Sequence, residues 1–263
     1  EILDNSIDEL ANGFGDKVVV TLNKDKSVTI EDNGRGIPTG IHPIKNKSGV
    51  EMVYTELHTG GKFNNSNYKT SGGLHGVGAA VVNALSKWLE VEIKQKGNIY
   101  KQRFHYGYDK ELNRDMPGTP ETALEIVGKT KETGSKTTFL PDSDVFGTID
   151  FKMDTIEERL LELSFQNKGI TLVLRDERKD EVTEKVFHSE RGLLDFIEYL
   201  NESKTVLHKD PVIFQGEKEI NGLMVSGEVC IQFTDSTTEH IASYVNNIPT
   251  KEAEIGRASC RER

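Results

Sequence analysis

The sequence has few of the residues that build disulfide frameworks, metal clusters or membrane spans. Its two cysteines, Cys230 and Cys260, have a spacing that fits neither a zinc motif nor a disulfide-rich scaffold. No apolar run approaches the length of a transmembrane helix, and no signal-peptide pattern stands at the front. We therefore expect a cytoplasmic protein with no membrane partner.

Positive charge is also scarce. The 263 residues include 33 Lys and Arg against 43 Asp and Glu, which gives a net charge of -10. This balance argues against broad nucleic-acid binding by these residues alone, because neutralising phosphates requires clustered cations. The hydrophobic content of 35% is enough for the core of one large domain or two ordinary ones.

Both ends of the sequence have the character of cut ends. The chain starts at Glu1, without Met, inside an apolar stripe of helical period, so we expect it to be truncated there. Residues 254–263 have no periodicity and an abrupt basic shift, and they resemble the translation of a sequencing adapter. We treat them as a non-native tail and leave them out of the fold.

The most informative stretch runs from Lys69 to Ala79. It has four glycines between positions 72 and 78 and precedes an apolar run, 79–85, that is typical of a packed helix. Backbone N–H groups that cluster in a glycine turn at the positive end of a helix suit phosphate oxygens. The stretch therefore predicts a phosphate loop, although a tight structural loop under a helix would look the same.

The N-terminal helix carries a polar face. Glu1, Asn5, Asp8 and Glu9 are spaced so that they share one side of a helix, next to an apolar stripe. Such a face is commonly just solvated. Asn is a poor helix former in mid-helix, however, and its amide oxygen is a plausible ligand for a hard cation.

A second polar feature is the turn 32–36, which follows two predicted strands, 17–22 and 27–31. Asp32 leaves the second strand into a turn with glycines at 34 and 36. Such a turn can hold a half-buried carboxylate while its backbone approaches a ligand closely. An ordinary Asp-Asn-Gly turn is the alternative.

The rest of the sequence predicts an α+β fold. Further strands are expected at 89–94, 98–104, 134–140 and 170–175, and helices at 49–57, 79–85 and 156–165. The alternation in 89–104 predicts a sheet with one wet face. Residues 106–130 are expected to be irregular, and the polar loop 58–68 to be a lid or disordered. A first domain is expected over 1–188 and part of a second over 189–253, with a helix at 192–201 and strands around 223–233 and 242–246.

Three separated sequence motifs together resemble those of a known family. They are Glu1 to Glu9, Asp32-x-Gly34-x-Gly36 and Gly73 to Gly78, in the order and spacing of the Bergerat (GHKL) ATPases. The nearly entire stretch 69–85 is similar to the ATPase region of the B subunits of bacterial type II topoisomerases. The resemblance covers about residues 1–252. Residues 128–139 and 151–165, together with Lys101, are more similar to topoisomerase IV than to gyrase.

The resemblance implies a two-layer sandwich of helices on a mixed sheet, followed by a truncated transducer domain, and it implies roles for particular residues. Glu1 would be the general base for the attacking water, and Asn5 would ligate Mg²⁺. Asp32 would accept the amino group of adenine, with the Ser135 hydroxyl nearby. The other implied contacts to ATP come from Glu9, Gly36, Lys62, Tyr68, Gly73, Leu74, His75, Gly76, Val77, Gly78 and Ala79.

The full-length protein is expected from the resemblance to dimerise on ATP, to act on DNA and to join an A subunit in an A2B2 assembly in the bacterial nucleoid. Catalysis by this piece alone is expected to be impaired, because the family supplies further elements beyond both ends. Three alternatives stay open: another Bergerat ATPase such as HSP90, MutL or a histidine kinase, a nucleotide-binding module without turnover, and a domain whose glycines are structural.

Overall fold

A computed structural model describes residues 1–57, 76–109, 113–220, 223–245 and 247–250. The chain forms two compact units. The first contains residues 1–157 and 171–187, and the second contains 158–170 and 188–263. The predictions for 58–75 and for the tail 254–263 lie outside the described residues.

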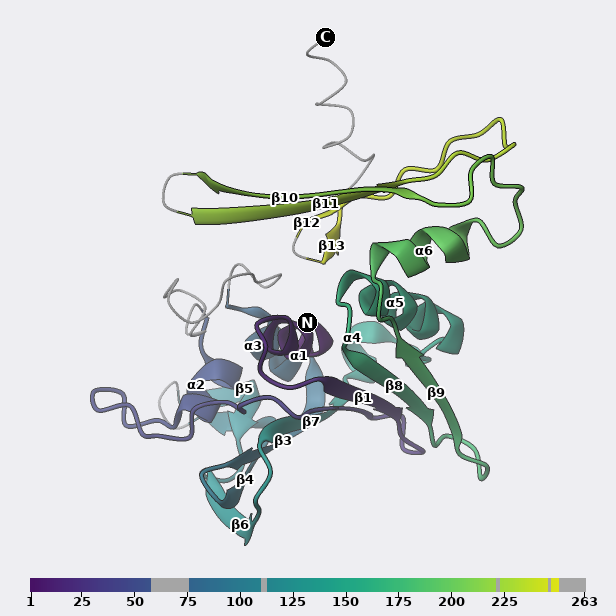
Figure 1. The fold of residues 1–263 in the computed structure, drawn as a ribbon. Coiled ribbons are helices and arrows are strands. Elements are labelled where there is room, and N and C mark those ends of the chain that lie inside the picture. Colours follow the sequence, from purple (N-terminus) through teal and green to yellow (C-terminus); the bar gives the residue numbers. More distant parts are fainter. Residues whose placement is uncertain (58–75, 110–112, 221–222, 246, 251–263) are drawn as a thin grey trace. The chain divides into compact units, whose positions relative to one another are not determined.

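Runs of strands are separated by one or two helices along the chain, as in an α+β protein (Figure 1). The helices are α1 (Ile2–Ala11), α2 (Gly49–Thr55), α3 (Gly78–Ala84), α4 (Ser143–Phe146), α5 (Met153–Gln166) and α6 (Leu193–Leu200). The strands are β1 (Lys17–Leu22), β2 (Val28–Asp32), β3 (Ser86–Gln95), β4 (Asn98–Asp109), β5 (Arg114–Pro120), β6 (Glu125–Lys129), β7 (Gly134–Pro141), β8 (Thr171–Asp176), β9 (Thr183–His188), β10 (Val212–Ile220), β11 (Leu223–Ile231), β12 (Tyr244–Val245) and β13 (Ile248–Pro249).

Nine of the described strands build one sheet in the first unit. Its order is β5-β4-β3-β7-β2-β1-β8-β9, and β6 also pairs with β4. The β1–β2 hairpin and the β2–β7 pair are antiparallel, whereas β1 and β8 run parallel. Strand β2 therefore lies inside the sheet, and its last residue, Asp32, is directly opposite Ser135 of β7.

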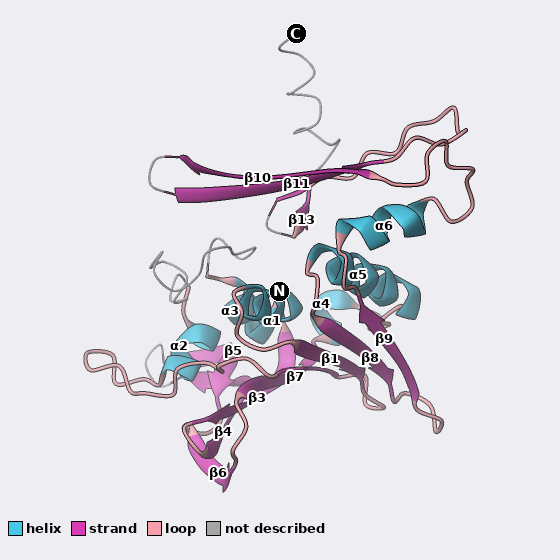
Figure 2. Ribbon diagram, viewed as in Figure 1, coloured by secondary structure: helices cyan, strands magenta, loops and turns pink. Residues whose placement is uncertain are grey.

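One face of this sheet is apolar and the other is charged. Helices α1, α2 and α3 lie on the same side of the strands (Figure 2), and the buried positions alternate along β3 as Leu89, Val91 and Ile93. Between them, Glu90 and Glu92 reach Lys101 of β4 at 2.8 and 3.6 Å. This period of two is what a half-buried antiparallel sheet requires, and it confirms the predicted wet face.

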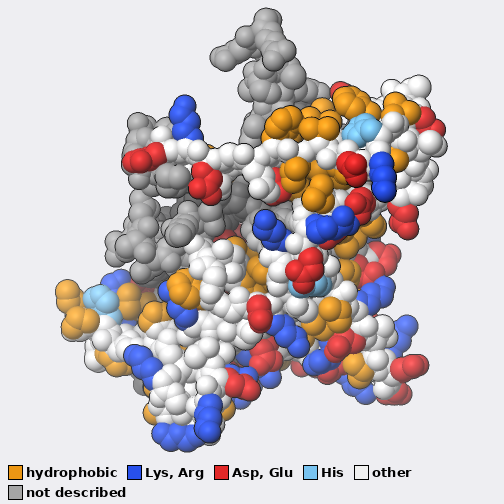
Figure 3. Space-filling model, in the orientation of Figure 1, with side chains coloured by type: hydrophobic (Ala, Val, Ile, Leu, Met, Phe, Trp, Pro, Cys, Tyr) orange, Lys and Arg blue, Asp and Glu red, His pale blue; other side chains and the backbone are white. Residues whose placement is uncertain are grey.

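One face of the molecule carries side chains of both signs of charge (Figure 3). Figure 3 shows acidic and basic side chains interspersed over the face drawn there, without a broad basic field. None of the helices in the described part of the chain is long and apolar enough to cross a membrane.

The helices form for recognisable local reasons. Ile7 and Leu10 of α1 are buried on one stripe, and α2 begins after Ser48, whose hydroxyl accepts a hydrogen bond from the Glu51 N–H at 3.0 Å. Such an N-cap satisfies a backbone donor that has no partner within the helix. Helix α3 begins at Gly78, as the glycine-rich stretch predicted.

Two segments differ from the sequence-based expectation. Residues 106–130 are not irregular: β4 continues to Asp109, and β5 and β6 pair with it. The polar charged segment after β8 likewise contains β9, at the edge of the sheet. These strands were missed because edge strands exposed to water lack the apolar alternation on which such predictions depend.

The second unit is held together by aromatic side chains. Phe165 of α5 stacks on Phe196 of α6 with ring centroids 5.2 Å apart, and Tyr244 of β12 lies 6.4 Å from Phe196. Strands β10 and β11 form an antiparallel hairpin, from Val212 opposite Ile231 to Ile220 opposite Leu223. The predicted helix 192–201 and the predicted strand around 223–233 are thus confirmed.

The end of β8 gives a test of the ion pairs in the first unit. Asp176 accepts hydrogen bonds from Nε and Nη2 of Arg178 at 2.9 and 2.8 Å, and these bonds hold the pKa of Asp176 at about 2, below its ordinary value. Because the folded-state pKa is depressed, the stabilisation is present above an unfolded pKa of about 3.9 and is lost as the pH falls through about 2.

We expect Asp176→Asn to lower the free energy of unfolding by about 1–2 kcal/mol at neutral pH, after allowance for the partial exposure of Arg178. The difference from the wild type should shrink as the pH falls from about 4 toward about 2. Urea unfolding at several pH values measures both effects. Asp180→Asn is the control, because Asp180 pairs with Lys24 at the open surface; a pH-independent loss in Asp176→Asn would contradict the assignment.

Candidate nucleotide site

The centre of the candidate site is the carboxylate of Asp32, which is 8% exposed. Its Oδ1 accepts hydrogen bonds from the N–H groups of Gly34 (3.0 Å) and Ser135 (3.3 Å). Its Oδ2 accepts from the hydroxyls of Ser6 (2.9 Å) and Ser135 (2.5 Å). A carboxylate has about four acceptor positions, so the protein's own donors are enough to fill them all.

Ser6 is a site residue that the sequence analysis missed. It lies on α1 and is 5% exposed, one residue after the polar position Asn5. A serine in an amphipathic helix carries no signal of its own, because its partner is 26 residues away. The pairing could have been found only by placing α1 across the end of β2.

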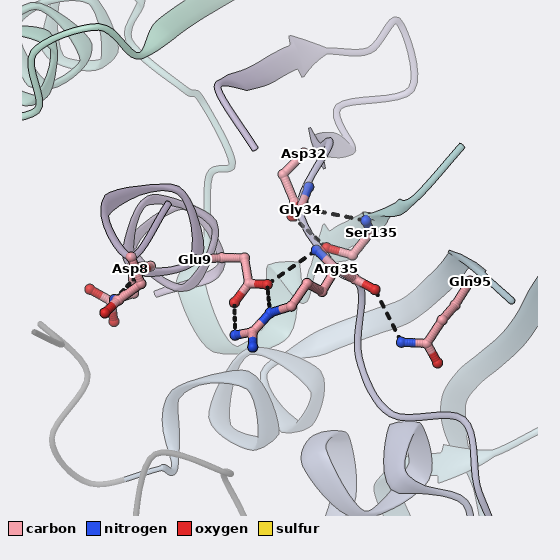
Figure 4. Close-up of polar contacts among 8 residues, drawn as sticks. Asp8, Glu9, Asp32, Gly34, Arg35, Gln95 and Ser135 are labelled. Atoms are coloured by element: carbon pink, nitrogen blue, oxygen red, sulfur yellow. Dashed lines mark hydrogen bonds and ion pairs between the residues drawn. The ribbon is translucent and has the colours of Figure 1, made fainter. Parts of the chain in front are cut away.

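Glu9 and Arg35 make a second link between α1 and the turn after β2 (Figure 4). Glu9 Oε1 accepts from the N–H and the Nε of Arg35 at 3.1 and 2.7 Å, and Oε2 accepts from Nη2 at 2.9 Å. The ring of Phe14 lies 3.3 Å from the guanidinium carbon, and the Arg35 carbonyl accepts from Gln95 Nε2 at 3.0 Å. The bidentate pair and the ring fix the plane of the guanidinium.

The predicted polar face of α1 is only partly as expected. Figure 4 shows Asp8 and Glu9 leaving α1 on different sides, with Glu9 directed at Arg35. Asp8 is 3% exposed, and its carbonyl accepts from the side chain of Asn12. Asp8 therefore does not share the face that Glu9 presents to the turn.

Glu1 lies at the start of α3. A Cβ on Gly78 would overlap with Glu1 Oε2, so the carboxylate occupies the space that a side chain at 78 would need. Asn5 follows one helical turn later on α1 and donates its N–H to the Glu1 carbonyl. Carboxylate and amide oxygens are the ligand class that Mg²⁺ prefers, so these residues fit that ion. Among the residues described here, no three His, Cys, Asp or Glu side chains converge on one point.

The glycine stretch is described only from its last residues. Gly76 has a φ of +59°, Val77 precedes α3, and Gly78 and Ala79 form its first turn. Gly36, at the end of the Asp32 turn, has a φ of +77°. The other predicted ligand contacts fall outside the described residues: Lys62, Tyr68, Gly73, Leu74 and His75.

The sheet continues the polar site inward from Asp32. Thr137, two residues after Ser135 on β7, lies opposite Ile30, and its hydroxyl is 2.8 Å from the hydroxyl of Tyr54. Both side chains are buried. Burial raises the pKa of Tyr54 above its ordinary range; the hydrogen bond with Thr137 lowers this pKa in part, and the negative charge of Asp32 raises it further. The phenol is therefore neutral at physiological pH.

A cavity of about 330 Å³ lies elsewhere, and Asp32 does not line it. Its walls come from the second half of α3, the end of β7 and residues 146–151. They are mainly apolar side chains, namely Val81, Val82, Leu85, Phe139, Pro141, Phe146, Ile149 and Phe151. The apolar cavity and the hydrogen-bonding groups around Asp32 thus lie at separate places on the first unit.

Comparisons with known proteins agree with this geometry. Residues 1–141 match the family model described as "Histidine kinase-, DNA gyrase B-, and HSP90-like ATPase", and residues 192–253 match the model described as "DNA gyrase B". The crystal structure of the 43K ATPase domain of Thermus thermophilus gyrase B in complex with an aminocoumarin is similar, with a TM-score of 0.77 and 33% identity over 94% of this chain and 59% of that one. This likeness confirms the expected α+β fold.

Two curated relatives are B subunits of DNA topoisomerase 4. That of Staphylococcus epidermidis is 49% identical over 253 residues, and that of Streptococcus pneumoniae serotype 4 is 50% identical over 255 residues. In both cases the match covers 96% of this chain and 36% of the relative. The chain therefore spans about a third of the length of these relatives.

Gly34 gives a test of how tightly α1 and the turn are packed. A Cβ at this position would lie 2.5 Å from Glu9 Cγ and 3.0 Å from Asp32 Oδ1. We expect Gly34→Ala to displace the Glu9 side chain and to lower the free energy of unfolding by about 1–3 kcal/mol, as overpacking commonly does. Gly40→Ala is the matched control, because nothing lies within 4 Å of its added Cβ. Equal urea midpoints for the two variants would show that the contact is not tight.

Proposed function

Because the chain belongs to the histidine kinase-, DNA gyrase B- and HSP90-like ATPase family, which confirms the resemblance seen in its motifs, we propose that it binds and hydrolyses ATP at the Asp32 site. The observation that carries the proposal is the buried Asp32 carboxylate, fixed at the end of β2 and tied to the helix that bears Glu1 and Asn5. A buried carboxylate with oriented donors is suited to read the donor edge of a base.

Adenine is recognised by an exchange of hydrogen bonds at Asp32. All acceptor positions of the carboxylate are in use, so the amino group of the base replaces one donor. The backbone N–H groups are fixed by the fold, and Ser6 is buried on α1, whereas Ser135 is partly exposed. The Ser135 hydroxyl turns from Oδ2 to a ring nitrogen of the base, and Oδ2 then accepts the amino N–H.

The phosphate end of the nucleotide lies between the start of α3 and α1. The N–H groups of residues 74–79 donate to phosphate oxygens, and Lys62 and Tyr68 add a charge and a nucleoside contact, as the family resemblance implies. Glu1 takes the proton from the attacking water. Asn5 would hold a Mg²⁺ ion, which would offset the charge that develops on the phosphates.

The whole protein, in this proposal, is the B subunit of a type II topoisomerase of the topoisomerase IV kind. Its curated relatives are named as such at 49–50% identity, whereas the similar gyrase B structure is 33% identical. In this assignment two B subunits close on a DNA segment when ATP binds, and an A subunit completes an A2B2 enzyme in the bacterial cytoplasm. ATP-dependent decatenation by the full-length protein with its A subunit is the assay that tests it.

Calorimetric titration of a non-hydrolysable ATP analogue with Mg²⁺ tests the nucleotide site directly. We expect saturable binding by the wild-type chain and a loss of at least about tenfold in Asp32→Asn, since a hydrogen bond to a charged group contributes about 1.5–3 kcal/mol. Inosine triphosphate, which presents a carbonyl where adenine presents its amino group, should bind more weakly to the wild type.

Circular dichroism of both proteins provides the control for folding. A folded wild type that binds neither nucleotide would reject the assignment of the site. Equal affinity of the wild type and Asp32→Asn would show that the protein binds the nucleotide without a contribution from Asp32.

A further inference from the structure

Asn33 lies inside the Asp32 turn, but its side chain points back toward the loop that follows α1. Its Oδ1 accepts hydrogen bonds from the backbone N–H groups of Asp16 and Lys17, both at 2.9 Å. Its Nδ2 donates to Asp16 Oδ1 at 2.7 Å. One side chain thus makes three hydrogen bonds to two consecutive residues.

The loop that Asn33 holds is also in contact with the other side of the turn. Phe14 donates its N–H to the carbonyl of Glu9 at 3.2 Å, and its ring lies against the guanidinium of Arg35. A Cβ on Gly34 would lie 3.2 Å from the Phe14 carbonyl. The loop after α1 and the turn after β2 are therefore packed along one another, with Asn33 as the hydrogen-bonded link.

We propose that Asn33 is a positioning residue for nucleotide binding, which sets the distance between the base end of the site on the turn and the phosphate end on α1. This inference rests on the proposed ATP site. Asp32 is on one side of the link, and Glu1 and Asn5 are on the helix at the other side. A ligand that contacts both ends binds more weakly if the distance between them is not fixed, because misplaced groups must be reordered on binding.

The chemistry of the link selects asparagine. Its amide supplies an acceptor for two N–H groups and a donor for the Asp16 carboxylate, whereas an aspartate would supply only acceptors and would face a like charge. Asn33 is itself exposed. Removing its side chain therefore leaves no buried polar group without a partner, so the fold survives the substitution.

The first experiment compares Asn33→Ala with Asn23→Ala. Asn23 is a matched control, because its Nδ2 also makes two hydrogen bonds, to Ser27 and Thr29, at the far end of the same hairpin. At a temperature where all the proteins are fully folded, we expect Asn33→Ala to bind the ATP analogue about fivefold to tenfold more weakly, the equivalent of one or two exposed hydrogen bonds. Asn23→Ala should bind like the wild type.

A reciprocal exchange separates positioning from a general loss of stability. Asn33→Asp alone places two carboxylates together at the Asp16 contact and should weaken binding. The double variant Asn33→Asp with Asp16→Asn restores one donor and one acceptor there, and we expect it to recover most of the affinity. Recovery of affinity by the exchange, with unchanged binding in Asn23→Ala, supports the positioning role.

The outcomes distinguish this inference from the function on which it rests. If the wild type binds the analogue and Asn33→Ala binds it equally well, the positioning role is wrong and the ATP site stands. If the double variant stays as weak as Asn33→Asp, the Asp16 contact is not the link. If the folded wild type does not bind at all, the proposed function itself fails.

Discussion

A buried carboxylate is tolerated only where donors satisfy its oxygens, and this constraint organises the first unit around Asp32. The donors come from three different elements: Ser6 of α1, the backbone of the turn after β2, and Ser135 of β7. The β1–β2 hairpin alone cannot supply them all. The packing of α1 across the strand ends and the pairing of β2 with β7 are therefore both conditions for the carboxylate to be buried where it is.

The sheet makes that arrangement unique. Val28, Ile30 and Asp32 are two residues apart along β2, so the three buried side chains lie on the same face of the sheet. A slip of one residue against β7 would turn Asp32 to the wet face and break its bonds to Ser135. The apolar residues of β2 thus determine on which face of the sheet Asp32 lies.

Much of this could be read from the sequence, and the remainder could not for a physical reason. Periodicity finds α1 by its apolar stripe and β3 by its alternating burial, whereas β1 and β2 are short apolar runs on either side of a polar turn. The two glycine turns stand out by composition alone. Ser6 and Asn33 carry no such signal. Their partners are 26 and 17 residues away, and they are common polar residues whose role is created only when α1 and its loop fold back on the turn. Strands β5 and β6 were missed for a different reason, since exposed edge positions do not alternate.

The hydrogen bonds that Asp32 accepts from the protein also bear on how a base would be selected in the proposed site. Since the protein already satisfies the carboxylate, an incoming amino group exchanges one hydrogen bond for another and gains less than it would from a carboxylate without partners. A base that presents a carbonyl at the same point binds more weakly, because its oxygen and Oδ2 are both acceptors. The Ser135 hydroxyl then keeps its hydrogen bond to Oδ2. Selectivity at such a site therefore comes more from rejecting the wrong edge than from attraction to the right one. Rejection of the wrong base requires that the carboxylate be held in place. In the proposed site, the links from α1 and its loop to the turn would therefore affect recognition although they would not contact the base.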